Sequence, residues 1–182
     1  MSALRLINET SIGTPVNRIS IEDVFSADFD VYCIQVVGTS SSTSMDNNSM
    51  DVQLVNSSGS TITDTIYDAE MVFARGFSAT YLSTGSANRN DFALMYHDTA
   101  ANNAYSNMIM WIFNPFQSDT YTFQVQQSSG FIRQPSNSIT GMMHKGIGVL
   151  KQKSCITGYS FVNRDNLNIA SGTFRTYGLR TD

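Results

Sequence analysis

Residues 120–126 read Thr-Tyr-Thr-Phe-Gln-Val-Gln, with an aromatic or β-branched apolar residue at every second position. Side chains of a β-strand alternate between two faces, so this spacing predicts a strand with one dry face and one solvated face. No stretch of the chain keeps apolar residues at helical spacing through three turns. The pattern therefore restricts the chain to a mainly β fold.

Further short apolar or alternating runs have the same character, and Ser, Thr, Asn and Gly fill the segments between them. These residue types favour turns, because they bond to their own backbone or tolerate unusual dihedral angles. The predicted strands are residues 3–7, 16–21, 31–37, 52–55, 61–66, 71–74, 92–96, 108–113, 120–126, 147–151, 156–162 and 172–179. The predicted long loops are residues 38–50, 83–91, 97–107, 127–146 and 163–171.

A dozen short strands without intervening helices predict an all-β fold, an antiparallel two-sheet sandwich of jelly-roll type. The chain has 182 residues, 41% of them hydrophobic, which is enough for one well-buried core. We therefore expect a single β-sandwich domain over residues 1–182, with residues 1–15 as a possible N-terminal arm.

Charge and cysteine content narrow the classes of partner. The formal net charge is −4, with no long basic block, which disfavours a nucleic-acid partner. The longest apolar run, residues 108–113, is far shorter than the ~20 residues of a membrane-spanning helix, so we expect no membrane partner. Cys33 and Cys155 are 122 positions apart and are expected to be buried free thiols.

Residues that carry enzymatic chemistry are scattered. The Gly-x-Ser-x-Gly motif that carries the nucleophile of many serine hydrolases is absent, and His97 and His144 are the only candidate imidazole bases. Together with Cys33 and Cys155, these two histidines lack the close spacing of zinc ligands. The sequence predicts no catalytic residue, no cofactor and no metal site, and a non-enzymatic protein.

Apolar residues also occur where the pattern predicts loops. Phe116 follows an Asn-Pro pair, while Phe131, Ile132, Met142 and Met143 fall within the predicted loop 127–146. Such residues either tuck under the ends of a sandwich or contact a partner. The chain also has nine methionines, whose flexible thioethers suit adaptable contacts.

Four segments carry a resemblance to a known group of proteins. Residues 21–32, Ile-Glu-Asp-Val-Phe-Ser-Ala-Asp-Phe-Asp-Val-Tyr, resemble the opening of small virion structural proteins encoded by tailed phages of marine cyanobacteria. Residues 51–59 and 145–150 are similar to later parts of that group, and residues 170–180 are similar to its closing strand. Residues 67–138 show no match.

The resemblance implies a β-rich, non-enzymatic building block of a phage particle. The first hypothesis is a capsid decoration or cement protein on the outer surface of the virion, made in the host cytoplasm and bound to the major capsid protein or other virion proteins. We expect a homo-oligomer, a trimer by analogy. The expected partner and oligomer contacts are Leu4, Leu6, Ile7, Phe116, Phe131, Ile132, Met142 and Met143.

Two alternatives stay open. A tail- or fibre-associated protein would contact a receptor, and Tyr105 in the predicted loop 97–107 is then the candidate for stacking on a glycan. The second alternative is a free carbohydrate-binding β-sandwich module.

Overall fold

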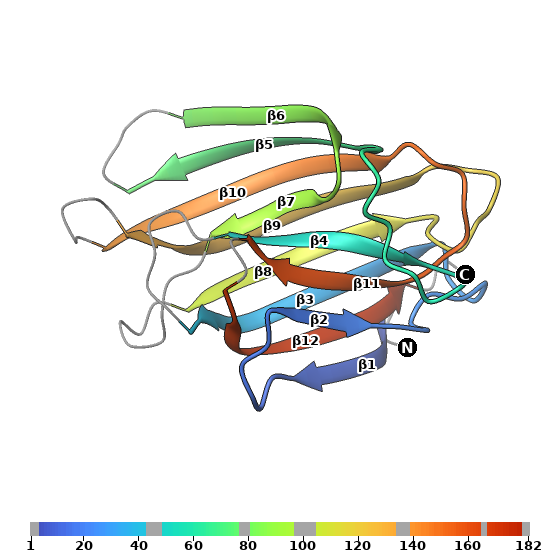
Figure 1. The fold of residues 1–182 in the computed structure, drawn as a ribbon, viewed down its shortest axis with the longest axis horizontal. Helices are drawn as coiled ribbons and strands as arrows, with labels where there is room; N and C mark the ends of the chain where they lie inside the picture. Colours follow the sequence, from blue (N-terminus) through green and yellow to red (C-terminus); the bar gives the residue numbers. More distant parts are fainter. Residues whose placement is uncertain are drawn as a thin grey trace.

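The computed structural model describes residues 4–42, 49–76, 81–96, 105–133, 139–164 and 167–179. These residues form twelve strands in two antiparallel sheets, which confirms the predicted all-β sandwich (Figure 1). Within these ranges, no helix has the length and apolar character needed to cross a bilayer. The strands are β1 (Leu4–Ser11), β2 (Arg18–Ile21), β3 (Val31–Ser41), β4 (Ser49–Asn56), β5 (Tyr67–Arg75), β6 (Tyr81–Arg89), β7 (Phe92–Tyr96), β8 (Ser106–Phe113), β9 (Thr122–Arg133), β10 (Ile139–Leu150), β11 (Ile156–Asn163) and β12 (Ile169–Leu179).

The two sheets differ in width. The larger sheet has eight strands in the order β1-β12-β3-β8-β9-β10-β5-β6, and the smaller has four in the order β2-β11-β4-β7. Strand β3 pairs with β12, β4 with β11 and β5 with β10, so the pairs are nested along the chain. This nesting is the wrapping expected of a jelly roll. In Figure 1 the smaller sheet lies in front of the larger one, and β5 and β6 extend beyond it.

Part of the predicted N-terminal arm is a strand of the chain's own sheet. Strand β1 pairs antiparallel with β12, with Leu4 opposite Leu179 and Ser11 opposite Thr173. The Nε of Arg175 donates to a carboxylate oxygen of Glu9 at 2.6 Å across this pair. In this structure, residues 4–11 are thus held by their own chain.

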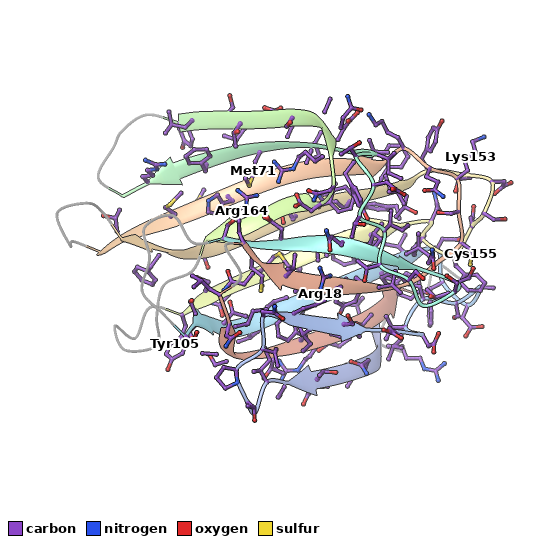
Figure 2. All side chains as sticks on the ribbon, viewed as in Figure 1. Arg18, Met71, Tyr105, Lys153, Cys155 and Arg164 are labelled. Atoms are coloured by element: carbon purple, nitrogen blue, oxygen red, sulfur yellow. The ribbon has the colours of Figure 1, made fainter. Side chains whose placement is uncertain are left out.

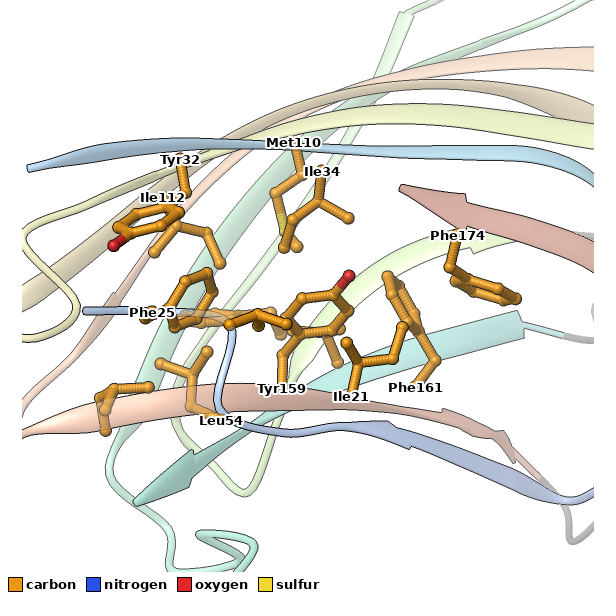
Figure 3. Packing of buried hydrophobic residues seen from close by; sticks show 14 of the residues in the cluster. Ile21, Phe25, Tyr32, Ile34, Leu54, Met110, Ile112, Tyr159, Phe161 and Phe174 are labelled. Atoms are coloured by element: carbon orange, nitrogen blue, oxygen red, sulfur yellow. The ribbon is translucent and has the colours of Figure 1, made fainter. Parts of the chain in front are cut away.

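The core lies between the sheets (Figure 3). Tyr32 and Met110 point inward from the larger sheet, and Tyr159 and Phe161 point inward from the smaller one; all four are fully buried. Phe25 precedes β3 and fills the space between the layers, with its ring centroid 4.6 Å from that of Tyr32 in an edge-to-face arrangement.

Two tyrosine hydroxyls hold the segments between strands to the sheets by hydrogen bonds. The Tyr67 hydroxyl accepts the Leu54 N–H and donates to the Ile62 carbonyl, both at 3.0 Å. The Tyr32 hydroxyl accepts the Ser26 N–H at 2.7 Å and donates to the Ser26 carbonyl at 2.8 Å. Each tyrosine thereby satisfies two backbone groups that no strand ladder reaches.

The predicted strand 61–66 is wrong, apart from one bridge between Val55 and Thr61. The Ile62 N–H donates to the Leu54 carbonyl at 2.8 Å and the Ile62 side chain enters the core, while the Ile66 N–H closes a tight turn onto the Asp64 carbonyl at 2.8 Å. The segment therefore turns from the smaller sheet to the larger one instead of continuing as a strand.

Two predicted loops are largely strands. Residues 83–91 lie mostly in β6, and residues 127–146 contain the end of β9 and most of β10. Polar and small residues fill both segments, so they lack the apolar alternation from which a strand is predicted. Pairing with β5 holds β6, and β8 and β10 flank β9. Neighbouring backbone, rather than local residue preference, sets these strands.

Candidate interaction surface

Strand β9 turns its polar side inward and its apolar side outward. Its inward side chains Thr122, Gln124, Gln126 and Ser128 are all at most 4% exposed, whereas Phe123 is 47% exposed. The apolar side of this strand was expected to be the dry one, and that expectation is wrong. The hydrophobic effect alone favours the opposite orientation.

Strand β10 shows this inversion in its central part only, because Met142 and Leu150 near its ends point inward and are buried. Its inward side chains include His144, which is 1% exposed, while Ile147 on the outward side is 58% exposed. Burial, together with the positive charge of Arg75, lowers the pKa of His144 to about 4, so the imidazole is neutral at pH 7. Its Nδ1 lies 3.2 Å from the Ser128 hydroxyl.

Small inward residues accompany the large outward ones on β10. A Cβ added at Gly148 would lie 2.6 Å from the Phe92 ring, so only glycine fits under β7 at this position. A glycine inside a strand commonly marks such a close approach. The bulky neighbours of Gly148 in the chain, Ile147 and Val149, point outward.

Outward apolar side chains continue across neighbouring strands, and we call this surface the outer face. Cross-strand neighbours place Trp111, Val125 and Ile147 in one row, and Phe113, Phe123 and Val149 in a second row. A third row is mainly polar, with Gln127 beside Lys145. The apolar residues of the outer face are Val31, Val37, Val72, Ile109, Trp111, Phe113, Phe123, Val125, Phe131, Met143, Ile147 and Val149.

Grooves run over this face. One of about 580 Å³ has Phe113, Phe123, Val125 and Ile147 in its lining and is bordered by residues 85–87 of β6. A second, of about 390 Å³, lies over Val37, Ile109 and Met143. The outer face is therefore a grooved surface and not a flat one.

A third groove, of about 510 Å³, gathers several residues singled out in the sequence. Tyr105, Phe131 and Met143 line it, together with Asn107 and Arg75. Tyr105 is 43% exposed and lies just before β8, at one end of the sandwich (Figure 2). The arrangement combines exposed aromatic rings with an amide and a guanidinium group.

The dimensions of the larger sheet suit a protein interface. Eight strands of about ten residues each, ~4.8 Å apart and with ~3.3 Å per residue, give its outer face on the order of 1,200 Å². A standard protein interface buries about 800 Å² on each partner, and only slightly more than half of that area is apolar. The polar row through Gln127 and Lys145 is therefore compatible with a contact over the whole face.

The remaining predicted contact residues lie in several places. On β1, Leu4 is half-buried, Leu6 is 51% exposed and Ile7 is 36% exposed. Phe116 follows β8 and is half-buried. The backbone of Ile132 lies in β9, but its side chain falls outside the described part of the structure.

Of these contact predictions, the surface placement of Met142 is wrong. Met142 is 4% exposed and packs with Phe73 in a small cluster separate from the main core. The reason is strand geometry, because successive residues of β10 point to opposite faces, which exposes Met143 and buries its neighbour. Sequence reasoning also missed Phe123, Val125 and Ile147, although the alternation with Gln and Gly around them was the available signal.

The cysteines and histidines show no catalytic grouping in the described ranges. Cys33 is fully buried, as predicted, and burial raises the pKa of its thiol to about 11; Cys155 is only half-buried, and both are free. His97 lies outside the described residues. Among the described side chains, no three from His, Cys, Asp and Glu are grouped so that they could hold a metal ion.

An ion pair joins buried Asp51 of β4 to the partly exposed Arg164, which follows the last residue of β11. Asp51, 2% exposed, accepts hydrogen bonds from the Nε of Arg164 at 3.0 Å and from its Nη2 at 2.7 Å. Burial, helped by the negative charge of Asp91, raises the pKa of Asp51 to about 6 against the opposing effect of Arg164. This carboxyl therefore gains a proton more readily in the folded chain than in the unfolded one.

No known protein family matches the chain, and no curated protein sequence matches it either. A solved structure of the CBM2 module of Lactobacillus casei BL23 phage J-1 evolved Dit aligns at 10% identity and a TM-score of 0.24, covering 91% of this chain and 70% of that one. The D431N mutant VP2 protein of infectious bursal disease virus aligns at 9% identity and a TM-score of 0.18, covering 97% and 40%. Alignments at these TM-scores do not establish a shared fold.

Proposed function

We propose that the chain is a non-enzymatic structural protein of a tailed-phage particle, a decoration or cement protein that attaches to the capsid lattice through its outer face. The observation that carries the proposal is the inverted polarity of β9, which buries Gln124 and Gln126 and exposes Phe123, together with the exposed Ile147 beside it on β10. A broad exposed apolar surface on a folded domain marks a contact with another molecule.

Three further features support this proposal. The four segments that resemble virion proteins of cyanobacterial phages include β10 residues 145–150, which contribute Ile147 to the outer face. The area of the outer face is large enough for one side of a stable protein interface. Leu6 extends the apolar surface to β1, since it lies opposite Tyr177 of β12 in the same sheet.

Stabilisation of the shell would follow from mass action. A protein that binds only the assembled lattice lowers the free energy of that lattice relative to its separated subunits. The chain needs no catalytic cleft for this role, only a surface that complements a repeated partner.

The test uses particles of the encoding phage prepared without the chain, to which purified protein is added back. Wild type is expected to bind in a saturable ratio and to raise the temperature at which the shell disassembles. Ile147→Asp should weaken binding by at least about tenfold, since it replaces a buried apolar contact with an unpaired charge. Ser57→Asp, in the exposed turn after β4, is the matched control and should bind like wild type.

Two results would refute this assignment. Wild type without effect on the shell would remove the cement role, and Ile147→Asp binding as well as Ser57→Asp would remove the outer face from the contact. Immunogold labelling of intact particles gives the location: label over the shell supports decoration, and label confined to the tail transfers the protein to the tail.

A second candidate function rests on the groove beside Tyr105. Exposed Tyr105 and Phe131 rings offer apolar platforms, and Asn107 offers an amide for hydroxyl groups, the combination that sugars require. A tail- or fibre-associated protein, or a free carbohydrate-binding module, would use it to hold a glycan. Glycan-array binding that is lost in Tyr105→Ala but kept in Tyr121→Ala, whose ring is equally exposed at 43%, supports this function; no binding by wild type contradicts it.

A further inference from the structure

Strand β6 forms one border of the larger sheet. It pairs on one side with β5, and no described strand pairs with its other side. In Figure 1, β6 lies at the edge of the sandwich with β5 as its neighbour, beyond the smaller sheet. The backbone N–H and C=O groups on its free side therefore form a template for another strand.

The other three edges carry features that block strand addition. Strand β1 has charged Arg5 and Glu9 and a shift in register after Leu6. Strand β2 has only four residues and begins at Arg18, and β7 has five residues with a register shift opposite β4. Short length, charge and bulges are the usual means by which natural sheets prevent edge pairing.

Strand β6 lacks all three features from Tyr81 to Ser86; its own register shift, opposite residues 67–69 of β5, lies beyond Ser86, where Asn88 has a positive φ of 58°. It has nine residues, and its sequence Tyr-Leu-Ser-Thr-Gly-Ser-Ala-Asn-Arg has neither a charge before Arg89 nor a proline. Tyr81 is 72% exposed and Leu82, on the opposite face, is 39% exposed, so neither face of the strand is covered. A strand with one neighbour and two wet faces gains most from a second neighbour.

We propose that β6 pairs antiparallel with β6 of a second copy of this chain, joining two larger sheets into one. The occupant is a second copy because the strand suits itself: its centre consists of small uncharged residues, so a twofold pairing brings no like charges or bulky side chains into opposition. This inference goes beyond the proposed function and does not depend on it. The resulting twofold dimer differs from the trimer expected by analogy.

The position of Glu70 selects the register. Its carboxylate lies over Gly85, in the space that a Cβ at that glycine would occupy. A pairing centred on Gly85 would bring two Glu70 carboxylates together. A pairing centred on Thr84 instead places Ser83 of the second copy opposite Gly85, with its hydroxyl on the same face as the Glu70 carboxylate.

The first experiment measures the mass of the full chain in solution by light scattering over a concentration series. Wild type is expected at twice the 20.1 kDa chain mass. Thr84→Lys places two ammonium groups opposite each other and should raise the dimer dissociation constant at least tenfold, with an unchanged circular dichroism spectrum. Ser57→Lys adds the same charge in the turn after β4 and should remain dimeric.

A second variant tests the register directly. Thr84→Cys, made together with Cys155→Ser, should form a covalent dimer under mild oxidation, because residues directly opposite in an antiparallel pair have neighbouring Cβ atoms. Ser57→Cys in the same background should not.

Monomeric wild type at high concentration, a dimer that survives Thr84→Lys, or absence of the Thr84→Cys cross-link overturns the proposed pairing. A wild-type dimer that fails to bind capsids contradicts only the proposed function.

Discussion

Removing one oxygen atom from Tyr67 tests whether its hydroxyl holds the segment after β4 to the larger sheet. Tyr67→Phe keeps the ring, which packs edge-to-face on Phe92 with centroids 4.8 Å apart. The change deprives the Leu54 N–H and the Ile62 carbonyl of their 3.0 Å partner at a site where Tyr67 and Leu54 are fully buried. Each lost partner costs about 1–2 kcal/mol, so the free energy of unfolding should fall by about 2–4 kcal/mol.

The assay is urea unfolding followed by the fluorescence of Trp111, the single tryptophan. A domain of this size loses about 2–4 °C of melting temperature per kcal/mol, so thermal unfolding should shift by roughly 10 °C. Tyr121→Phe is the control, because Tyr121 is 43% exposed and should lose less than about 0.5 kcal/mol. Equal stability of the two variants would show that water replaces the hydroxyl and that the bridge contributes nothing.

Four further predictions concern titratable groups, a close packing contact and the two thiols. The Asp51 pKa of about 6 lies above its usual 3.8, so the stability linked to this group is full below about pH 4 and is lost as pH rises through 6. This pH dependence is worth up to about 3 kcal/mol in the free energy of unfolding. Asp51→Asn should remove it from unfolding measured between about pH 4 and 7.5. His144, with its pKa lowered to about 4, acts in the opposite sense: its contribution is present above pH 6.5 and is lost toward pH 4, and His144→Gln should remove that loss. Gly158→Ala should cost about 1–3 kcal/mol in chemical denaturation, because the added Cβ would clash with the Ile21 carbonyl oxygen of β2; an unchanged midpoint would contradict this packing. Thiol labelling of native protein at pH 8 should modify Cys155 well before Cys33, and equal rates would contradict the burial of Cys33.

The sequence pattern was sufficient for the fold class and for most strands, because side-chain alternation and turn residues are local properties. Strands β3, β8 and β11 overlap the runs in which they were predicted, and each contributes inward apolar residues such as Ile34, Met110 and Phe161. Strand β6 was missed because its Ser, Thr and Gly residues favour turns, and its pairing with β5 overrides that preference.

The orientation of the strands was beyond the reach of the pattern. Alternation shows that Phe123 and Gln124 lie on opposite faces, but it does not show which face meets the core. That choice depends on the neighbours of β9 and on the partner layer, which are distant in the sequence. The same limit explains Met142 and Met143, where a loop was predicted and one residue is buried while the other is exposed.

The two proposed contacts lie in different directions and are therefore compatible. An antiparallel pairing of β6 continues one sheet into the next, so both outer faces of the dimer point to the same side. Attachment of the first face to a lattice then raises the effective concentration of the second face at a neighbouring site, which strengthens binding without any new contact.

This combination makes a prediction that neither contact makes alone. Thr84→Lys lies on β6 and adds no charge to the apolar rows of the outer face, yet it should weaken binding to capsids at least tenfold by making the protein monovalent. Ile147→Asp should weaken capsid binding while leaving the dimer intact. Sedimentation velocity of each variant, paired with its capsid-binding isotherm, separates the two effects. Capsid binding by Thr84→Lys at wild-type strength, in a protein shown to be monomeric, would mean that a single outer face suffices and that pairing through β6 serves another purpose.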